Sequence, residues 1–293
     1  MKTGTSDYLL ENRLNRLDPG LHRRFRDTVF ALQNTLFRFR QLFPEFTDHS
    51  SLHSLSVINF CNHLIGPEQI LELNADTIYA LLMGCYLHDV GMGISEEQYR
   101  MFSTEIDFGD YPRKHPDAGI PMIVRDFHQE FSAAFIRRFS PFLEIPSQEH
   151  ERAVIQVCRG HRKTDLFDRS EFPVHFTVPN GNEIQLPYLA ALLRLADEID
   201  VAADRNPIML YDMDSFHDPK EIAFLKRHMA VRDMKITKDV FVLTASHIDE
   251  ETDQMVQVMV QKMEETLRLC RDAVKAGSSF RISQLKVLIR WES

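Results

Sequence analysis

The chain has 293 residues, of which 44% are hydrophobic and 26% charged, and its formal net charge is -9. This composition is typical of a folded globular protein with a large core and excludes a mostly disordered chain. The negative net charge excludes an extended nucleic-acid surface, because neutralising phosphates along a duplex requires clustered Lys and Arg.

The first third of the chain predicts helices. Apolar residues recur at helical spacing from Leu21 to Phe43, and Asp48 or Ser50 could cap a second helix that runs to Gly66. A third helix is expected from about Asn74 to Asp89, where Gly91 and Gly93 end it.

The polar segment 102–114 contains Gly and Pro and predicts a loop that leads to His115-Pro116 at the start of a further helix. Helices are expected over 117–139 and 147–162. The alternating segment 174–186, with Pro-Asn-Gly-Asn at its centre, predicts a β-hairpin, and an apolar helix is expected over 187–202.

After Pro207 the pattern changes to mixed helix and strand. We expect a helix near 218–229, a strand at Met234–Ser246, a long helix at 249–275 and a closing strand at Gln284–Trp291. The predicted organisation is a helical domain over 1–207, with its core at 45–207, and a small α+β appendage over 208–293. The apolar side of the long helix favours core packing, and a homodimer seam is the alternative.

The four cysteines are dispersed and form no Cys-x-x-Cys pair, which favours reduced thiols and a cytoplasmic protein. The N-terminus lacks the apolar region of a secretory signal, and no stretch has the apolar length of a membrane span. We therefore expect neither secretion nor membrane insertion.

The dipeptide His88-Asp89 closes the apolar run 79–87. A buried ionisable pair carries a large desolvation cost unless something compensates for it, and a divalent cation between the two side chains would do so. This dipeptide therefore predicts a metal site, in which His88 and Asp89 are the candidate catalytic residues.

Three more side chains are predicted to lie on buried helix faces. His161 follows Val157 by four residues, Asp197 follows Leu193 by four, and His53 precedes Val57 by four. A lone buried His is more often a hydrogen-bonded core residue than a ligand, and Arg194 could pair with Asp197. As a set, imidazole nitrogens and carboxylate oxygens suit Fe, Mn, Ni or Zn, with Mg as a further candidate.

These residues resemble the HD-domain metal-dependent phosphohydrolases, whose pattern is a His, a later adjacent His-Asp pair, and a final Asp on successive helices. The matching positions are His53, His88-Asp89 and Asp197, and the resemblance covers about residues 45–207. It implies a mainly α fold: an HD-domain helical bundle with a β-hairpin insertion and the small C-terminal α+β appendage.

The resemblance also implies a pair of ions. His53, His88, Asp89 and Asp197 would hold one, and Asp89 would bridge to a second held by His115 and His161. His49 stands four residues before His53, where some family members carry a further ligand, although a packing or capping role is equally consistent with this position.

Two features distinguish the chain from the HD-GYP branch of this family. His161 is followed by Arg-Lys-Thr rather than by a second His and Gly-Tyr-Pro, and Met92 replaces the usual Lys. The chain looks more like HD domains found beside Hsp90-like ATPase modules, on the basis of the hairpin, the sequence Ala-Asp-Glu-Ile-Asp and the C-terminal part.

The implied function is hydrolysis of a phosphoester or phosphoanhydride, in a small substrate such as a nucleotide, by metal-activated water. Lys114, Arg162 and Lys163 are the candidate substrate-binding cations, with solvated surface charges as the alternative. A non-catalytic nucleotide-binding regulatory module is the main competing function, and a metal-dependent oxygenase is a third.

Overall fold

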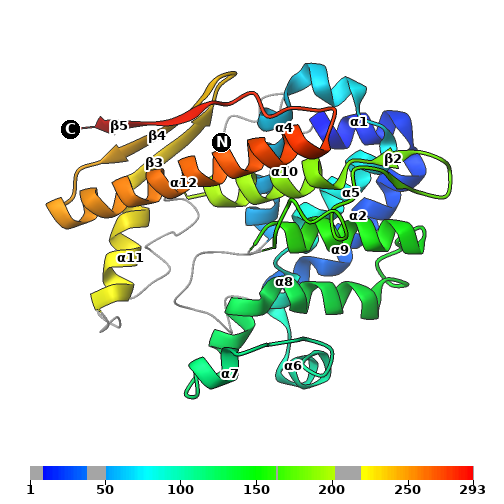
Figure 1. Ribbon diagram of the computed structural model, residues 1–293, viewed down its shortest axis with the longest axis horizontal. Coiled ribbons are helices and arrows are strands. Elements are labelled where there is room, and N and C mark those ends of the chain that lie inside the picture. The colour runs from blue at the N-terminus through cyan, green and yellow to red at the C-terminus, as the bar shows by residue number, and fades with distance from the viewer. Residues whose placement is uncertain (1–8, 38–50, 163, 202–218, 293) are drawn as a thin grey trace.

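The computed structural model describes residues 9–37, 51–162, 164–201 and 219–292. The fold is mainly α, with a short β-hairpin and a small C-terminal α+β part, which confirms the predicted fold class. Figure 1 shows most of the helices packed into one bundle, with the three-stranded sheet along one side of it and α11 standing apart.

The helices of the bundle follow one another from the N-terminus to residue 199. Their bounds are α1 (Leu9–Leu17), α2 (Pro19–Phe37), α4 (Ser51–Glu72), α5 (Ala75–Leu87), the 3-10 turn η1 (Val90–Gly93), α6 (Glu96–Phe102), α7 (Tyr111–Lys114), α8 (Ile120–Phe139), α9 (Gln148–Gly160) and α10 (Leu186–Ile199).

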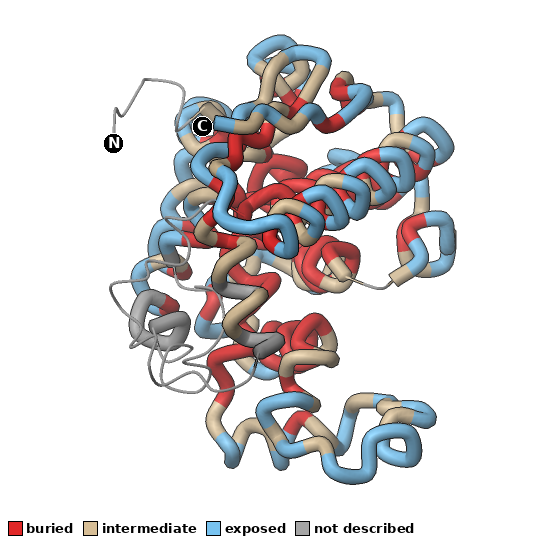
Figure 2. Tube along the Cα trace, turned by 90° about the vertical axis from the view of Figure 1, so that its left-hand side faces the viewer, coloured by how far each residue is buried: buried red, intermediate tan, exposed pale blue. Residues whose placement is uncertain are grey.

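Helix α5 is the centre of the bundle. Asn74 caps its N-terminus by accepting a hydrogen bond from the Thr77 amide at 2.8 Å, and every residue from Asp76 to Leu87 is buried. Helices α1, α2, α4, α9 and α10 pack around it. Figure 2 shows the buried positions concentrated inside the bundle. Because α5 is surrounded, any polar group at its end is held in a dry environment.

Several helices differ from the prediction, among them α6, which was not predicted, and α7, which lies within the segment 102–114 that was expected to be a loop. Helix α1 was not predicted, although its buried Leu10 and Leu14 lie four residues apart, as on one helix face. Helix α4 does not stop at Gly66: the chain bends there, with a φ of 77°, and Pro67 starts a further helical stretch to Glu72. The predicted start of this helix near Asp48, and His49, lie outside the described residues.

The predicted hairpin forms from β1 (Phe176–Thr177) and β2 (Glu183–Ile184), which pair antiparallel. Its turn is fixed to the bundle by Asp76, at the start of α5, which accepts hydrogen bonds from Asn180 and Asn182 at 3.0 and 2.7 Å. The ring of His150 in α9 bonds the other oxygen of Asp76 at 2.8 Å. One buried carboxylate therefore joins two helices and the hairpin.

The C-terminal part comprises α11 (Pro219–Ala230), β3 (Val231–Ile236), β4 (Val240–Ser246), α12 (Glu250–Gly277) and β5 (Lys286–Glu292). The sheet order is β3-β4-β5, with β3 antiparallel and β5 parallel to β4. The single strand expected over 234–246 is thus two strands joined by a tight turn at residues 237–239.

Helix α12 lies against α10 and contributes to the core. Its buried side carries Val256, Met259, Met263, Leu267 and Cys270. All four cysteines are buried and free. Within the described part of the chain, no helix is both long enough and apolar enough to span a membrane.

Candidate metal centre

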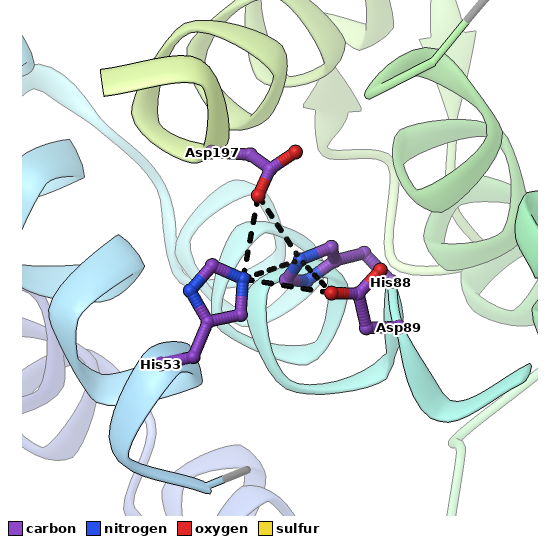
Figure 3. Close-up of side chains that lie close together, drawn as sticks. All are labelled: His53, His88, Asp89 and Asp197. Carbon is purple, nitrogen blue, oxygen red and sulfur yellow. Dashed lines mark hydrogen bonds and ion pairs between the residues drawn. The ribbon is translucent and has the colours of Figure 1, made fainter. Parts of the chain in front are cut away.

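Four side chains from three helices point toward one another in the middle of the bundle (Figure 3). His53 comes from α4, His88 and Asp89 follow the end of α5, and Asp197 comes from the last turn of α10. Each offers one nitrogen or oxygen atom, and these atoms all lie within 4.8 Å of one another. We refer to them as the four-residue group.

The distances within the four-residue group describe a tight cluster. Nε2 of His53 lies 3.1 Å from Nε2 of His88, 3.5 Å from Oδ2 of Asp89 and 3.3 Å from Oδ1 of Asp197. Nε2 of His88 lies 3.3 Å from the same oxygen of Asp89. His53, His88 and Asp89 are all less than 5% exposed, and Asp197 is partly exposed.

A second cluster shares Asp89 and adds two histidines. His128 of α8 and His161, the residue that ends α9, direct their Nε2 atoms at each other across 2.9 Å. These atoms lie 3.3 and 3.7 Å from Oδ1 of Asp89, the oxygen that faces away from His53. Asp89, His128 and His161, all buried, form the three-residue group.

The corner after α5 is what places Asp89 between the two groups. The His88 amide still bonds to the Gly84 carbonyl at 2.9 Å, and then the chain leaves the helix at Asp89. The hydroxyl of Ser132 in α8 donates to the His88 carbonyl at 2.6 Å and accepts from the Gly91 amide at 2.9 Å. One serine thus ties both sides of the corner to the helix that carries His128.

Gly91 allows α8 to come this close. A Cβ atom at this position would lie 2.4 Å from the carbonyl oxygen of His128 and 2.6 Å from the amide nitrogen of Ser132. Both are backbone atoms that cannot rotate away, so no larger residue fits without moving α8. The distance between Asp89 and His128 therefore depends on a glycine.

The end of α9 that carries His161 is held by α10. The guanidinium of Arg194 donates to the carbonyl oxygens of Gly160 and Thr164, each at 2.7 Å. The first bond satisfies a carbonyl that the end of a helix otherwise leaves unpaired, and the second holds the loop that follows. The sequence left open an ion pair between Arg194 and Asp197. In the structure Asp197 faces His53 and His88 instead.

The electrostatics of the four-residue group favour positive charge. Burial lowers the pKa of His88, but the carboxylates of Asp89 and Asp197 outweigh burial and raise it to about 10. Burial raises the pKa of Asp197, yet hydrogen bonds with His53 and His88 hold it well below its ordinary value. Two carboxylates among buried rings therefore stabilise a cation between them.

The three-residue group has the opposite preference for protons. Burial lowers the pKa of His161 well below its usual value, and the neighbouring His88 and His128 lower it further. A neutral imidazole presents a lone pair, which is the form that binds a metal. Both groups thus offer nitrogen and carboxylate oxygen atoms in a buried place, so the donor set fits divalent transition metals.

The structure brings together five of the six predicted ligands and excludes His115. This residue follows the end of α7 on the surface, where its ring stacks on Tyr111 with 4.4 Å between centroids. The expected helix at Pro116 begins only at Ile120, so His115 remains in the connecting loop. His128, about two turns into α8, lies beside Asp89 and His161 instead.

His128 and Asp200 are site residues that the sequence analysis missed. His128 lies four residues after Val124 and three before Phe131, the same buried-face spacing that singled out His161. Asp200 follows Asp197 by three residues, and its Oδ2 lies 2.6 Å from Nδ1 of His53. Its position at the end of α10 gave no periodic signal.

The predicted substrate-binding cations lie in different surroundings. Lys114 is exposed at the end of α7, and Arg162 is half-buried directly after His161. Lys163, like His49, lies outside the described residues.

Comparison with protein families matches residues 43–277 to the family described as HD-CE. Comparisons with curated proteins and with solved structures return no match. The matched range covers most of the chain and includes every residue of both groups, and the resemblance to HD domains predicted from the sequence is confirmed. This protein therefore belongs to the HD-CE family, an HD-domain-type family, and carries buried His/Asp groups that could hold metal ions.

Proposed function

We propose that this protein is a metal-dependent phosphohydrolase that cleaves a phosphoester or phosphoanhydride of a small substrate, and that the substrate is a nucleotide. The observation that carries the proposal is the position of Asp89, one oxygen of which faces the four-residue group and the other the three-residue group. A carboxylate shared in this way suits two neighbouring cations.

Bound divalent ions would supply the charge that acidifies a water molecule and stabilises negative charge on phosphate oxygens. The chain's own residues would set where this happens. His53, His88 and Asp197 would hold one ion, His128 and His161 the other, and Asp89 both. Backbone hydrogen bonds to His88, His128 and His161 keep these rings aimed at the centre.

The chain also offers positive charge for a phosphate beside the three-residue group. Arg162 follows His161, and Arg125 precedes His128 by three residues. Burial lowers the pKa of Arg125, the neighbouring carboxylate of Asp126 raises it in part, and the positive charge of Arg162 lowers it again. Two guanidinium groups that repel each other would be stabilised by an anion between them, which supports Arg162 as a substrate-binding residue. Lys114 and Lys163 remain predictions from the sequence alone.

The test has two stages. Elemental analysis of the purified chain should find bound transition metal, and a panel of nucleotides should then show release of phosphate or nucleoside. Asp89→Ala should lose both metal and activity, whereas Asp117→Ala, an exposed carboxylate on the loop after α7, should keep both.

Three results would redirect the proposal. Bound metal without cleavage of any phosphoester under any metal loading would favour a non-catalytic nucleotide-binding module. Turnover that depends on oxygen would favour an oxygenase. A chain that binds no metal would overturn both the hydrolase and the oxygenase.

A further inference from the structure

His53 lies between two carboxylates at the C-terminal end of α10, one from its last turn and one from the residue that directly follows it. Its Nε2 atom is 3.3 Å from Oδ1 of Asp197, a member of the four-residue group. Its Nδ1 atom, on the opposite side of the ring, is 2.6 Å from Oδ2 of Asp200. The ring and Asp200 are both less than 5% exposed.

The other three imidazoles of the two groups are oriented differently. Nδ1 of His88 donates to the Cys85 carbonyl at 3.0 Å, and Nδ1 of His128 donates to the Arg125 carbonyl at 2.6 Å. Nδ1 of His161 donates to the Cys158 carbonyl. In each case the acceptor is a neutral main-chain oxygen three residues earlier in the sequence, whereas His53 meets a charged side chain from another helix.

Asp200 is itself held in place by α4. Oγ of Ser56, three residues after His53 and therefore on the same side of the helix, donates to Oδ1 of Asp200 at 2.9 Å. One oxygen of Asp200 thus meets Ser56 and the other meets His53. This two-point contact with one helix face defines the orientation of the carboxylate and, through it, that of the ring.

We propose that Asp200 is a positioning residue that makes the four-residue group the tighter of the two metal sites. An Nδ1–H donated to a carboxylate fixes the tautomer whose Nε2 lone pair faces the group, and the negative charge makes that nitrogen a stronger ligand. In the three-residue group, Nδ1 of His128 and Nδ1 of His161 bond instead to main-chain carbonyls, which carry no net charge. This inference rests on the proposed metal centre. It adds that the four-residue group binds its ion before the three-residue group does.

The test measures metal affinity rather than turnover. The full chain, freed of metal by dialysis against a chelator, is titrated with Co²⁺ and with Zn²⁺ in competition with an indicator. Asp200→Asn keeps the size of the side chain but removes its charge, and we expect the tighter ion to bind about 10- to 100-fold more weakly. The Co²⁺ absorption bands of the tighter site should shift as well, and binding of the weaker ion should change little.

Asp76→Asn is a matched control. Asp76 is also a buried carboxylate bonded to a histidine ring, but it stands at the opposite end of α5 from His88, about 18 Å away at 1.5 Å per residue. This variant should lose stability and keep wild-type metal affinity. If it weakens binding as much as Asp200→Asn does, general destabilisation explains both effects and the inference is overturned.

The remaining outcomes separate this inference from the proposed function. Loss of binding in Asp197→Ala with wild-type affinity in folded Asp200→Asn would overturn the inference alone. A wild-type chain that binds no metal would overturn the metal centre, and the inference with it. If Asp200→Asn does not fold, Ser56→Ala replaces it: about 3- to 10-fold weaker binding is expected from the lost hydrogen bond, and unchanged affinity overturns the inference.

Discussion

Oδ1 of Asp89 lies 3.3 Å from Nε2 of His128, a residue of α8, and this helix packs against the turn η1 that follows Asp89. The second oxygen of Asp89 is already directed at His88 and His53. This single carboxylate therefore connects the two groups, and most of the predictions below concern the contacts that keep it there.

Asp89→Ala should remove a ligand from both groups at once. Loss of an outer contact to a metal ligand typically costs 10- to 100-fold, so loss of the shared ligand should reduce turnover by more than about 100-fold. Metal content per chain should fall in parallel, as measured by elemental analysis. Retention of both bound ions would contradict the shared role.

Substitution of His128 and of His115 should have opposite effects on metal content. The comparison distinguishes the ligand set seen in the structure from the one implied by the family pattern. His128→Gln should lower metal content toward one ion per chain, because only Asp89 and His161 of the three-residue group remain. His115→Gln should leave metal content unchanged, because its ring is exposed and stacked on Tyr111. The reverse result would restore the ligand set implied by the family pattern.

Gly91→Ala should destabilise the fold and separate the two groups. The added Cβ would meet two backbone atoms of α8 at 2.4 and 2.6 Å, and overpacking of this kind costs about 3 kcal/mol. Urea unfolding would measure the loss. Gly119→Ala is the control, since a Cβ there meets Pro121 at an ordinary 3.7 Å and should cost about 1 kcal/mol or less.

Asp76 should make folding stability depend on pH in the acid range. Burial raises the pKa of Asp76, but hydrogen bonds from His150, Asn182 and Asn180 together lower it from 3.8 to about 2. A lowered folded-state pKa stabilises the fold above pH 4, and this contribution, about 2 kcal/mol, is lost as the pH falls from 4 toward 2. Urea unfolding of the wild type and Asp76→Asn should therefore differ most at neutral pH and converge near pH 2.

Arg194→Met should loosen the end of α9. It leaves the carbonyls of Gly160 and Thr164 without their guanidinium partner, which costs about 1–3 kcal/mol for buried acceptors. Arg138→Met, an exposed arginine on α8, should change the free energy of unfolding by less than about 0.5 kcal/mol. Equal effects of the two substitutions would contradict the anchoring role of Arg194.

Much of the helical framework could be predicted because its signal is periodic. The run at 79–87 indicated an apolar helix that ends in His88-Asp89, and α5 ends there. The turn at 237–239 contains no glycine, so the segments on either side of it were read as one strand. The division of the chain at residue 207 stays a prediction.

Those site residues could be predicted whose burial follows from their spacing along a helix. The spacing that placed His161 on a buried face applies equally to His128, yet spacing cannot say which of two histidines meets a third residue on another helix. His115 was favoured by its place in the chain order, whereas its actual position depends on where α7 ends. Asp200 lies where α10 stops, and there the direction of a side chain follows the local turn rather than a period of 3.6. The metals and the substrate stay predictions.

The candidate ligands are carried by α4, α5, α8, α9 and α10, which are far apart in the sequence and meet only in the folded chain. An ion held by them would stabilise the fold, because it would bind the folded chain and not the unfolded one. Resistance of this protein to heat and to proteases would then rise and fall with the supply of that ion. The amount of folded protein in a cell would then depend on the supply of the metal as well as on the rate of synthesis.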